Sequence, residues 1–325
     1  MQKRLFKTNE SLVGVLILAI IVIFSIISPE FRSISAVFNI LRASIVSSIV
    51  ALALLLVFIS GGIDMSFMSV ASVSMYATVR LLTNLEINPP LVVVFLIGAV
   101  VGAILGLINA LFVTKTDMPI FIVTLATHFI YKGACLAFIG VEVLDVPESM
   151  ISLSRSNLIS LPMPDGSVTN LNSSILIVVA LYVLVFLILK YTKFGRKLFA
   201  LGGDTVAAAR SGINVPLTIT LMFVCAGVIA SVAGILNASL LRLATPGDMI
   251  GNELPIMAAV ILGGADSAKG RGSVHGTALG VLLIAIISNS LTMLRIPSYW
   301  QKAVLGLIVI IGTVLQHVLG KKENA

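Results

Sequence analysis

The side chains that could do chemistry in this sequence gather in two glycine-rich stretches that interrupt long apolar segments. The first stretch is Ser60-Gly61-Gly62-Ile63-Asp64-Met65-Ser66, and the second runs from Asn252-Glu253 to Gly263-Gly264. Paired glycines free the backbone, and an aspartate side chain can accept the first amide hydrogens of a following helix. The first stretch is therefore either a capped cytoplasmic turn or a broken helix at a gate, and the residues alone leave both interpretations open.

Breaks of this kind suit the passage of a polar solute, because the ends of half-helices offer free amides and carbonyls. A polar residue inside an apolar span is costly unless it faces a cavity or a partner, which singles out His128. Packing and helix-to-helix hydrogen bonds also explain many hydroxyls in membranes. We predict a gate or translocation path that includes Gly61, Gly62, Asp64, Ser66, Thr124, Thr127, His128, Asn237, Asn252, Glu253, Gly263 and Gly264.

No residue set typical of an enzyme or a cofactor site is visible in the sequence. It contains no Gly-x-x-x-x-Gly-Lys-Ser/Thr loop for nucleotide phosphates and no cluster of His, Cys and carboxylates at metal-ligand spacing. A nucleophile with a base placed to activate it is also absent. The two cysteines, Cys135 and Cys225, lie in apolar stretches, where packing is the expected role. We therefore expect neither catalysis nor a bound metal or cofactor in this chain.

The elements that must position these residues are membrane-spanning helices. Hydrophobic residues make up 58% of the 325 residues and charged residues only 11%, whereas soluble domains contain about 25% charged residues. Most apolar runs are near the ~20 residues that a helix needs to cross a bilayer, and two are shorter. We predict an all-α polytopic membrane protein, one domain over residues 1–325, with about ten spans near residues 12–28, 41–60, 66–83, 91–113, 119–140, 173–191, 215–241, 252–263, 273–293 and 299–318.

The charges between the spans predict the orientation. With the N-terminus inside and ten crossings, the inner segments carry about twice as many lysines and arginines as the outer ones, among which Arg42 is counted. Both termini are then cytoplasmic, and the one sizeable external loop is about residues 141–172. No basic face or set of stacking aromatics indicates nucleic acid. Four external arginines are either ordinary flanking charges or docking points for acidic residues of an external protein, namely Arg32, Arg80, Arg155 and Arg242.

A basic stretch, residues 190–216, interrupts the apolar sequence on the predicted cytoplasmic side. Asp204 is a good N-cap, Arg210 suits the negative end of a helix dipole, and Gly212 fits a left-handed stop. These signals predict a helix of about two turns, which is too short to persist alone in water and must dock on something. Another protein and anionic lipid are both suitable partners, and local chemistry favours neither.

Separate motifs spread over the whole chain resemble the permease subunit of ribose-type (simple-sugar) ABC importers. They are Ser60-Gly61-Gly62-Ile63-Asp64-Met65-Ser66, the stretch from Phe194-Gly195-Arg196 to Gly212-Ile213-Asn214-Val215, Ala258-Ala259-Val260-Ile261-Leu262-Gly263-Gly264, and the closing Leu294-Arg295-Ile296-Pro297-Ser298-Tyr299-Trp300. The resemblance implies a permease dimer, an ATPase subunit that binds ATP and Mg on the cytoplasmic face, and an external binding protein that delivers the sugar. It also implies a coupling segment, about residues 192–214, seated in a groove of the ATPase through Gly195, Arg196, Asp204, Ala208, Arg210 and Gly212.

The function predicted on this basis is import of a ribose-like monosaccharide, or a related small polyhydroxylated solute, across the bacterial cytoplasmic (inner) membrane by a homodimer or heterodimer of permeases. We expect a neutral solute, because no charge counterpart is obvious among span residues such as Ser47, Ser48, Ser288 and Asn289. Import of autoinducer-2 by the same machinery is an alternative. A stand-alone ion-coupled secondary transporter would need a buried coupling carboxylate, for which Asp64 and Glu253 are the candidates. A membrane-embedded enzyme would need a convergent catalytic set.

Overall fold

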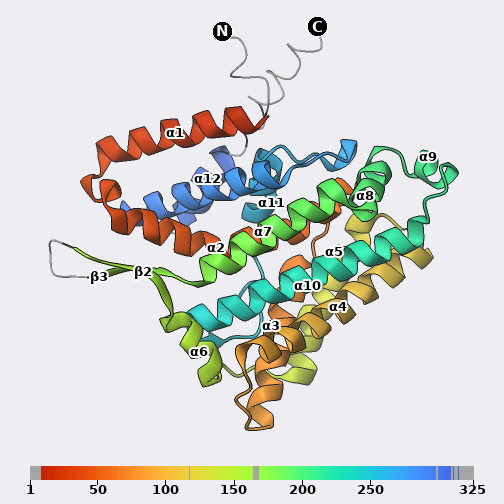
Figure 1. Ribbon diagram of the computed structural model, residues 1–325, viewed down its shortest axis with the longest axis horizontal. Coiled ribbons are helices and arrows are strands. Elements are labelled where there is room, and N and C mark those ends of the chain that lie inside the picture. The colour runs from red at the N-terminus through yellow and green to blue at the C-terminus, as the bar shows by residue number, and fades with distance from the viewer. Residues whose placement is uncertain are drawn as a thin grey trace, which may run out of the picture.

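The structure, a computed structural model, describes residues 9–116, 118–163, 168–297, 299–308, 310 and 314. Within these residues the chain is almost entirely helical, with two short antiparallel strand pairs (Figure 1). The elements are α1 (Asn9–Ile27), η2 (Pro29–Arg32), α2 (Ile34–Ile59), α3 (Phe67–Asn84), α4 (Leu91–Thr116), α5 (Ile120–Ala134), η3 (Cys135–Ile139), β1 (Leu144–Asp145), α6 (Glu148–Arg155), β2 (Asn157–Pro162), β3 (Val168–Asn172), α7 (Ser174–Tyr191), α8 (Lys193–Gly203), α9 (Thr205–Arg210), α10 (Val215–Leu241), β4 (Leu243–Ala244), α11 (Glu253–Leu262), η4 (Ser267–Lys269) and α12 (Val274–Met293).

Seven helical segments of the described chain are long and apolar enough to cross a membrane, namely α1, α2, α4, α5 continued by η3, α7, α10 and α12. The predicted all-α polytopic class is therefore confirmed. Two of the other predicted spans correspond to α3, which is 18 residues long but rich in serine and threonine, and to α11, which has only 10 residues. The last predicted span is helical over residues 299–308. The count of ten spans stays a prediction, as does the cytoplasmic location of the two chain ends, which lie outside the described residues.

The start of α2 corrects one predicted boundary. The helix begins at Ile34, well before residue 41, because the Ser33 hydroxyl accepts the amide of Ala36 at 3.1 Å and caps it. Arg42 consequently lies inside the helix, and its count as an external charge stays a prediction. The helix tolerates the charge of Arg42, because the side chain lines a cavity. Water or a solute in this cavity can form hydrogen bonds with the guanidinium group.

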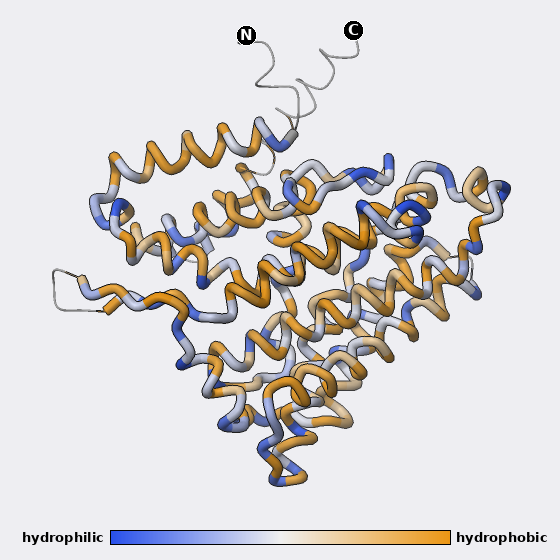
Figure 2. The backbone as a smooth tube through the Cα atoms, viewed as in Figure 1, coloured by the Kyte–Doolittle hydropathy of each residue, from blue (hydrophilic) through white to orange (hydrophobic). Residues whose placement is uncertain are grey.

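The core surrounds the second half of α2, in which every residue from Ser48 to Ile59 is buried. Helices α3, α7, α10, α11 and α12 pack around it. Large apolar side chains such as Leu18, Val92 and Leu176 are exposed on the outer helices, as expected of surfaces that face lipid tails. Figure 2 shows hydrophobic residues along most of the helices and hydrophilic residues gathered at their ends. This distribution matches a protein that crosses a membrane with its helix ends in water.

The closest helix pair is α4 with α10, and glycines make the approach possible. A Cβ atom on Gly102 would overlap the main chain of Gly227, and one on Gly227 would overlap the carbonyl of Gly102. One turn further along α4, a Cβ on Gly106 would overlap the carbonyl of Phe223. Small residues at helix interfaces let backbones pack closely where no hydrophobic force drives association. We call the contact of Gly102 and Gly106 with α10 the α4–α10 seam.

The predicted cytoplasmic and external segments lie at opposite ends of the same helices. Helices α8 and α9 follow one end of α7, whereas α6 and the β2–β3 hairpin lie at the other end (Figure 1). The predicted external loop 141–172 thus contains β1, α6, β2 and β3 in the described residues. Strand β1 pairs with β4, which joins this loop to the segment that follows α10. The arrangement separates the two regions in which different partners were expected.

Candidate functional site

A cavity of about 990 Å³ opens between α2, α10, α11 and α12. Its wall carries amide and hydroxyl side chains as well as apolar ones. Asn237 and Asn252 of the predicted path lie on it, together with Ser47, Ser288 and Asn289, which the sequence suggested for a polyhydroxylated solute. Amide side chains both donate and accept hydrogen bonds, so this wall can bind a hydroxyl group that donates and one that accepts. We call this space the polar cavity.

Three charged residues on the polar cavity were not foreseen from the sequence. Asp248, Arg42 and Lys302 line it, although no charge counterpart is obvious among the span residues in the sequence. Asn237 donates to the Asp248 carboxylate at 2.9 Å and holds it on the wall. Within the described part of the chain, neither Arg42 nor Lys302 has an ion-pair partner. Arg42 could have been found from the sequence, because it follows a Ser33 cap inside an apolar run.

The first glycine-rich stretch folds into a buried, non-helical link between α2 and α3. The Asp64 side chain is only 3% exposed, and its Oδ1 atom accepts the amide and the hydroxyl of Ser66 at 2.6 and 2.7 Å. Asn109 of α4 donates to the same hydroxyl at 2.7 Å and accepts from Tyr131 of α5 at 2.9 Å. The N-cap of α3 is Ser66, without a side-chain cap bond. Asp64 thus lies two residues before the N-cap position and accepts the Ser66 amide with its side chain, and the two interpretations of this stretch, a capped turn and a gate, both stay predictions.

Thr124, Thr127 and His128 do not line the polar cavity, and Thr124 and His128 instead connect α5 to the two breaks. Thr124 accepts the amide of Met65 at 3.0 Å and donates to the carbonyl of Ile63 at 3.3 Å, and these bonds hold the first break in place. The Thr127 hydroxyl donates within its own helix, to the carbonyl of Thr124 at 3.2 Å. The sequence could not show that the Thr124 hydroxyl points toward the first break, because the polarity of a residue does not say which face of a helix contacts a neighbouring segment.

The second glycine-rich stretch meets α5 through a buried pair of ionisable residues. His128 Nδ1 lies 3.8 Å from Glu253 Oε1 and 3.3 Å from the hydroxyl of Ser69 in α3. Both carboxylate oxygens of Glu253 accept the amide of Gly251 at 3.0 Å. The structure thus brings His128 and Glu253 together at the start of α11, although nothing in the sequence indicates their proximity.

Gly263 and Gly264 end α11. A Cβ on Gly263 would overlap the carbonyl of Gly276 in α12, and Gly264 has a φ of +92°. The first glycine therefore permits close packing, while the second permits the left-handed turn.

The basic stretch forms two helices, α8 and α9, where the sequence predicted one. The expected cap is present, since Asp204 accepts the amides of Val206 at 2.8 Å and Ala207 at 3.0 Å. The expected stop is also present, since Gly212 has a φ of +82° and the Ile213 amide donates to the carbonyl of Ala208 at 3.1 Å. The sequence does not predict the amphipathic helix α8, because its cationic residues also fit a flanking charge cluster.

The residues predicted to couple to an ATPase are distributed over both faces of this element. Arg196, Asp204 and Arg210 are exposed, whereas Gly195 and Ala208 are buried against the protein's own chain. A Cβ on Gly195 would overlap the carbonyl of Leu189, so this glycine allows the sharp turn from α7 into α8. The exposed groups are therefore available to a partner, and the buried ones position them.

The four predicted docking arginines already have partners within the chain. Arg80 pairs with Glu142 and Arg155 with Glu148, both at 2.8 Å. Arg242 donates to the hydroxyl of Ser154 at 2.9 Å, and Arg32 donates to the carbonyl of Ser25 at 2.6 Å. Their role in docking stays a prediction.

Comparison with known proteins gives a consistent result over nearly the whole chain. Residues 36–313 match the family described as branched-chain amino acid transport system / permease component. The chain is 30% identical to the ribose import permease protein RbsC of Haemophilus influenzae, over 98% of this chain and 96% of that protein. It is 32% identical to the protein of the same name from Bacillus subtilis, over 94% and 91%. The D-allose transport system permease protein AlsC of Escherichia coli is 30% identical over 94% and 91%. No solved structure matches.

Proposed function

Because the chain belongs to the branched-chain amino acid transport system / permease component family, we propose that it is the membrane subunit of an ATP-driven importer of a monosaccharide. The predicted resemblance to sugar ABC permeases is confirmed by relatives named for ribose import. The observation that carries the proposal for this chain is the polar cavity, whose wall combines amides, hydroxyls and a few charges between membrane-spanning helices.

The polar cavity suits a polyhydroxylated solute. A site built from hydrogen-bonding groups favours a solute that satisfies them all, because buried polar groups left unpaired are costly. Asn237 and Asn252 can each donate and accept, and Asp248 can accept from a pair of sugar hydroxyls while Asn237 keeps it in place. Among relatives, the printed names include ribose, D-allose and galactose permeases, which supports a monosaccharide. Autoinducer-2 would use the same hydroxyl chemistry and is kept as an alternative.

Energy would come from a separate ATPase that docks on α8 and α9. The support is the exposed surface of this element, where Arg196, Arg210 and the apolar Val206 are available to a partner. Importers of this family work with an ATPase and a binding protein in general. In this proposal ATP and Mg bind to the ATPase, and its movement drives α8 and α9. The path through the membrane then opens alternately outward and inward.

The complete transporter would contain two permease copies in the bacterial cytoplasmic membrane. The polar cavity supports this arrangement, because the exposed Arg42 and Lys302 on its wall would be unfavourable in contact with lipid tails. A second copy would cover this side and enclose the path. An external binding protein would deliver the sugar at the end that carries α6 and the β2–β3 hairpin.

Reconstitution tests the proposal. The permease is purified, placed in liposomes with an ATPase and a sugar-binding protein from the same organism, and given radiolabelled D-ribose, D-allose or D-galactose. We expect uptake of at least one of these sugars. This uptake should require ATP on the side of the membrane where the ATPase is bound, and the loaded binding protein on the other side. Uptake driven by a proton or sodium gradient without ATP would contradict the proposal and favour a secondary transporter that uses Asp64 or Glu253.

A further inference from the structure

Two walls of the polar cavity end at the same glycine of α8. Helix α2 lines the cavity through Arg42 and Ser47 and ends at Ile59, beside α8. Helix α11 lines it through Ile256 and Ala259 and continues into the turn that contains η4. That turn also contacts α8. The sequence gives no sign of this convergence, because the three segments lie far apart in the chain.

The three segments meet through their main chains at Gly61, Gly202 and Gly270. A Cβ on Gly202 would overlap the carbonyl of Ile59 and would lie 2.5 Å from the Cα of Gly270. A Cβ on Gly61 would lie 3.3 Å from the Cα of Gly202. Gly61 and Gly270 also have φ values of +90° and +57°, and residues that carry a side chain rarely adopt such backbone angles. We call this contact the glycine junction.

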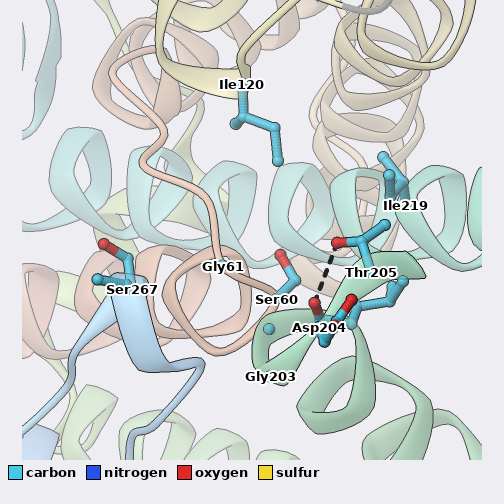
Figure 3. Close-up of a pocket in the computed structure, with 11 residues that line it drawn as sticks. Ser60, Gly61, Ile120, Gly203, Asp204, Thr205, Ile219 and Ser267 are labelled. Carbon is cyan, nitrogen blue, oxygen red and sulfur yellow. Dashed lines mark hydrogen bonds between the residues drawn. The ribbon is translucent and has the colours of Figure 1, made fainter. Parts of the chain in front are cut away.

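The glycine junction borders a pocket and is not enclosed by side chains. The pocket, of about 270 Å³, is lined by Ser60 and Gly61 from the end of α2, by Asp204 and Thr205 between α8 and α9, and by Ser267 of η4 (Figure 3). Free volume on one side allows the three joined segments to shift together without first displacing packed side chains. Close contact on the other side means that such a shift is passed on.

We propose that the glycine junction transmits the movement of α8 and α9 to α2 and α11, and so to both walls of the polar cavity. Main chain in contact with main chain leaves no rotatable side chain between the segments to absorb a displacement. Gly202 acts here as a positioning residue, since it touches the ends of the two wall segments and no solute. This inference rests on the proposed function, because it assumes that a partner moves α8 and α9.

A matched pair of neighbouring glycines tests the glycine junction. Gly202→Ala places a methyl group against Ile59 and Gly270, whereas a Cβ on Gly203 meets nothing within 4 Å. Both variants are reconstituted with the ATPase and the binding protein, and uptake of radiolabelled D-ribose and ATP hydrolysis are measured together. For Gly202→Ala we expect about a ten-fold fall in sugar imported per ATP hydrolysed, the order of a coupling between two sites. Gly203→Ala should match the wild type.

The outcomes separate this inference from the proposed function. If the wild type imports sugar with ATP and Gly202→Ala does so with the same ratio, the glycine junction does not transmit movement. If the wild type shows no ATP-driven uptake of any sugar tested, the proposed function itself fails. If uptake and hydrolysis fall together in Gly202→Ala, the methyl group has disturbed ATPase docking and transmission at this contact is rejected.

A second experiment covers a Gly202→Ala protein that does not fold. Cys135 and Cys225 are replaced by alanine, and Thr205→Cys with Ser267→Cys places two thiols on the wall of the pocket. A reducible linker that joins them fixes η4 to the start of α9. We expect uptake to continue on cross-linking, because segments that move together need no displacement relative to each other, and either single cysteine treated with the linker should also stay active. Uptake that stops on cross-linking and returns on reduction would show that η4 and α9 must separate during transport, and would overturn the proposal.

Discussion

The α4–α10 seam and the glycine junction both bring main chain against main chain, yet their surroundings differ. The seam runs between two long helices, α4 and α10, and Gly227 faces Gly102 within it. The glycine junction joins the ends of three segments beside a pocket of about 270 Å³. Glycine at an enclosed helix interface fixes two elements to each other, whereas glycine at segment ends beside free volume permits a concerted shift. The same residue type therefore serves stability in one place and movement in the other.

The largest effect is expected in the seam. Gly102→Ala would force apart two helix backbones that have no side chain to rearrange, and we expect a loss of roughly 3 kcal/mol in the free energy of unfolding. The measurement is thermal unfolding of the purified protein in detergent. The control is Gly133→Ala late in α5, where a Cβ meets nothing within 4 Å. It should be neutral or more stable by up to about 1 kcal/mol. Equal stability of the two variants would remove the distinction drawn for the seam.

A smaller loss is expected from the polar network next to the seam. Asn109→Ala leaves the Ser66 hydroxyl without its donor and the Tyr131 hydroxyl without one acceptor in a buried site. We expect a loss of about 1–3 kcal/mol in stability, and unchanged sugar uptake per folded molecule. Tyr131→Phe is the milder comparison, because it removes one hydroxyl and keeps the ring. Impaired uptake at full stability would instead place this network on the transport pathway.

The polar cavity should respond in the opposite way, with transport affected and stability kept. Asp248→Asn removes the charge that Asn237 holds on the wall. We expect uptake to fall about ten-fold, because a hydrogen bond to a charged group is stronger than one to a neutral group. The thermal midpoint should not change. Asp145→Asn, in the exposed end of β1, is the control and should transport normally. Equal uptake by the two variants would argue against solute contact at Asp248.

The smallest effect is expected on the external surface. Arg155→Ala breaks an exposed ion pair with Glu148, and such pairs contribute up to about 1 kcal/mol. We expect a similarly small change in stability and an affinity for the loaded binding protein close to that of the wild type, measured by surface binding. An affinity loss of about ten-fold, or 1.4 kcal/mol, would identify Arg155 as a docking residue after all.

The sequence predicted helices well where apolar runs end in clear signals. The span 215–241 coincides with α10, because Asn214 caps its start and Pro216 occupies its first turn. The predicted start of α2, residue 41, lies inside the helix, which begins after the Ser33 cap. Helix α8 is not predicted, because Lys193, Arg196 and Lys197 suggest only a charge cluster.

The site was predicted in part, because a sequence does not show in which direction a polar side chain on a helix points. Asn237 and Asn252 were recognised as polar residues in apolar surroundings and do line the polar cavity. Thr124 and His128 satisfied the same criterion but turn toward the two breaks, since a sequence does not say which helix faces which. The seam could have been found, because Gly98, Gly102 and Gly106 recur at four-residue spacing on one face of α4. The glycine junction could not, because its three glycines come from distant segments.

The short pairing of β1 with β4 has a consequence for how α11 can shift. This strand pair fastens residues 243–244 to the loop after α5, and the glycine junction fastens Gly270 to α8. The stretch between them is thus anchored at both ends. A change in its path has to be absorbed by the non-helical residues on either side of α11, and among those before α11 Gly247 and Gly251 adopt left-handed angles. One compliant part of the chain therefore lies directly against the polar cavity, at Asp248 and Asn252.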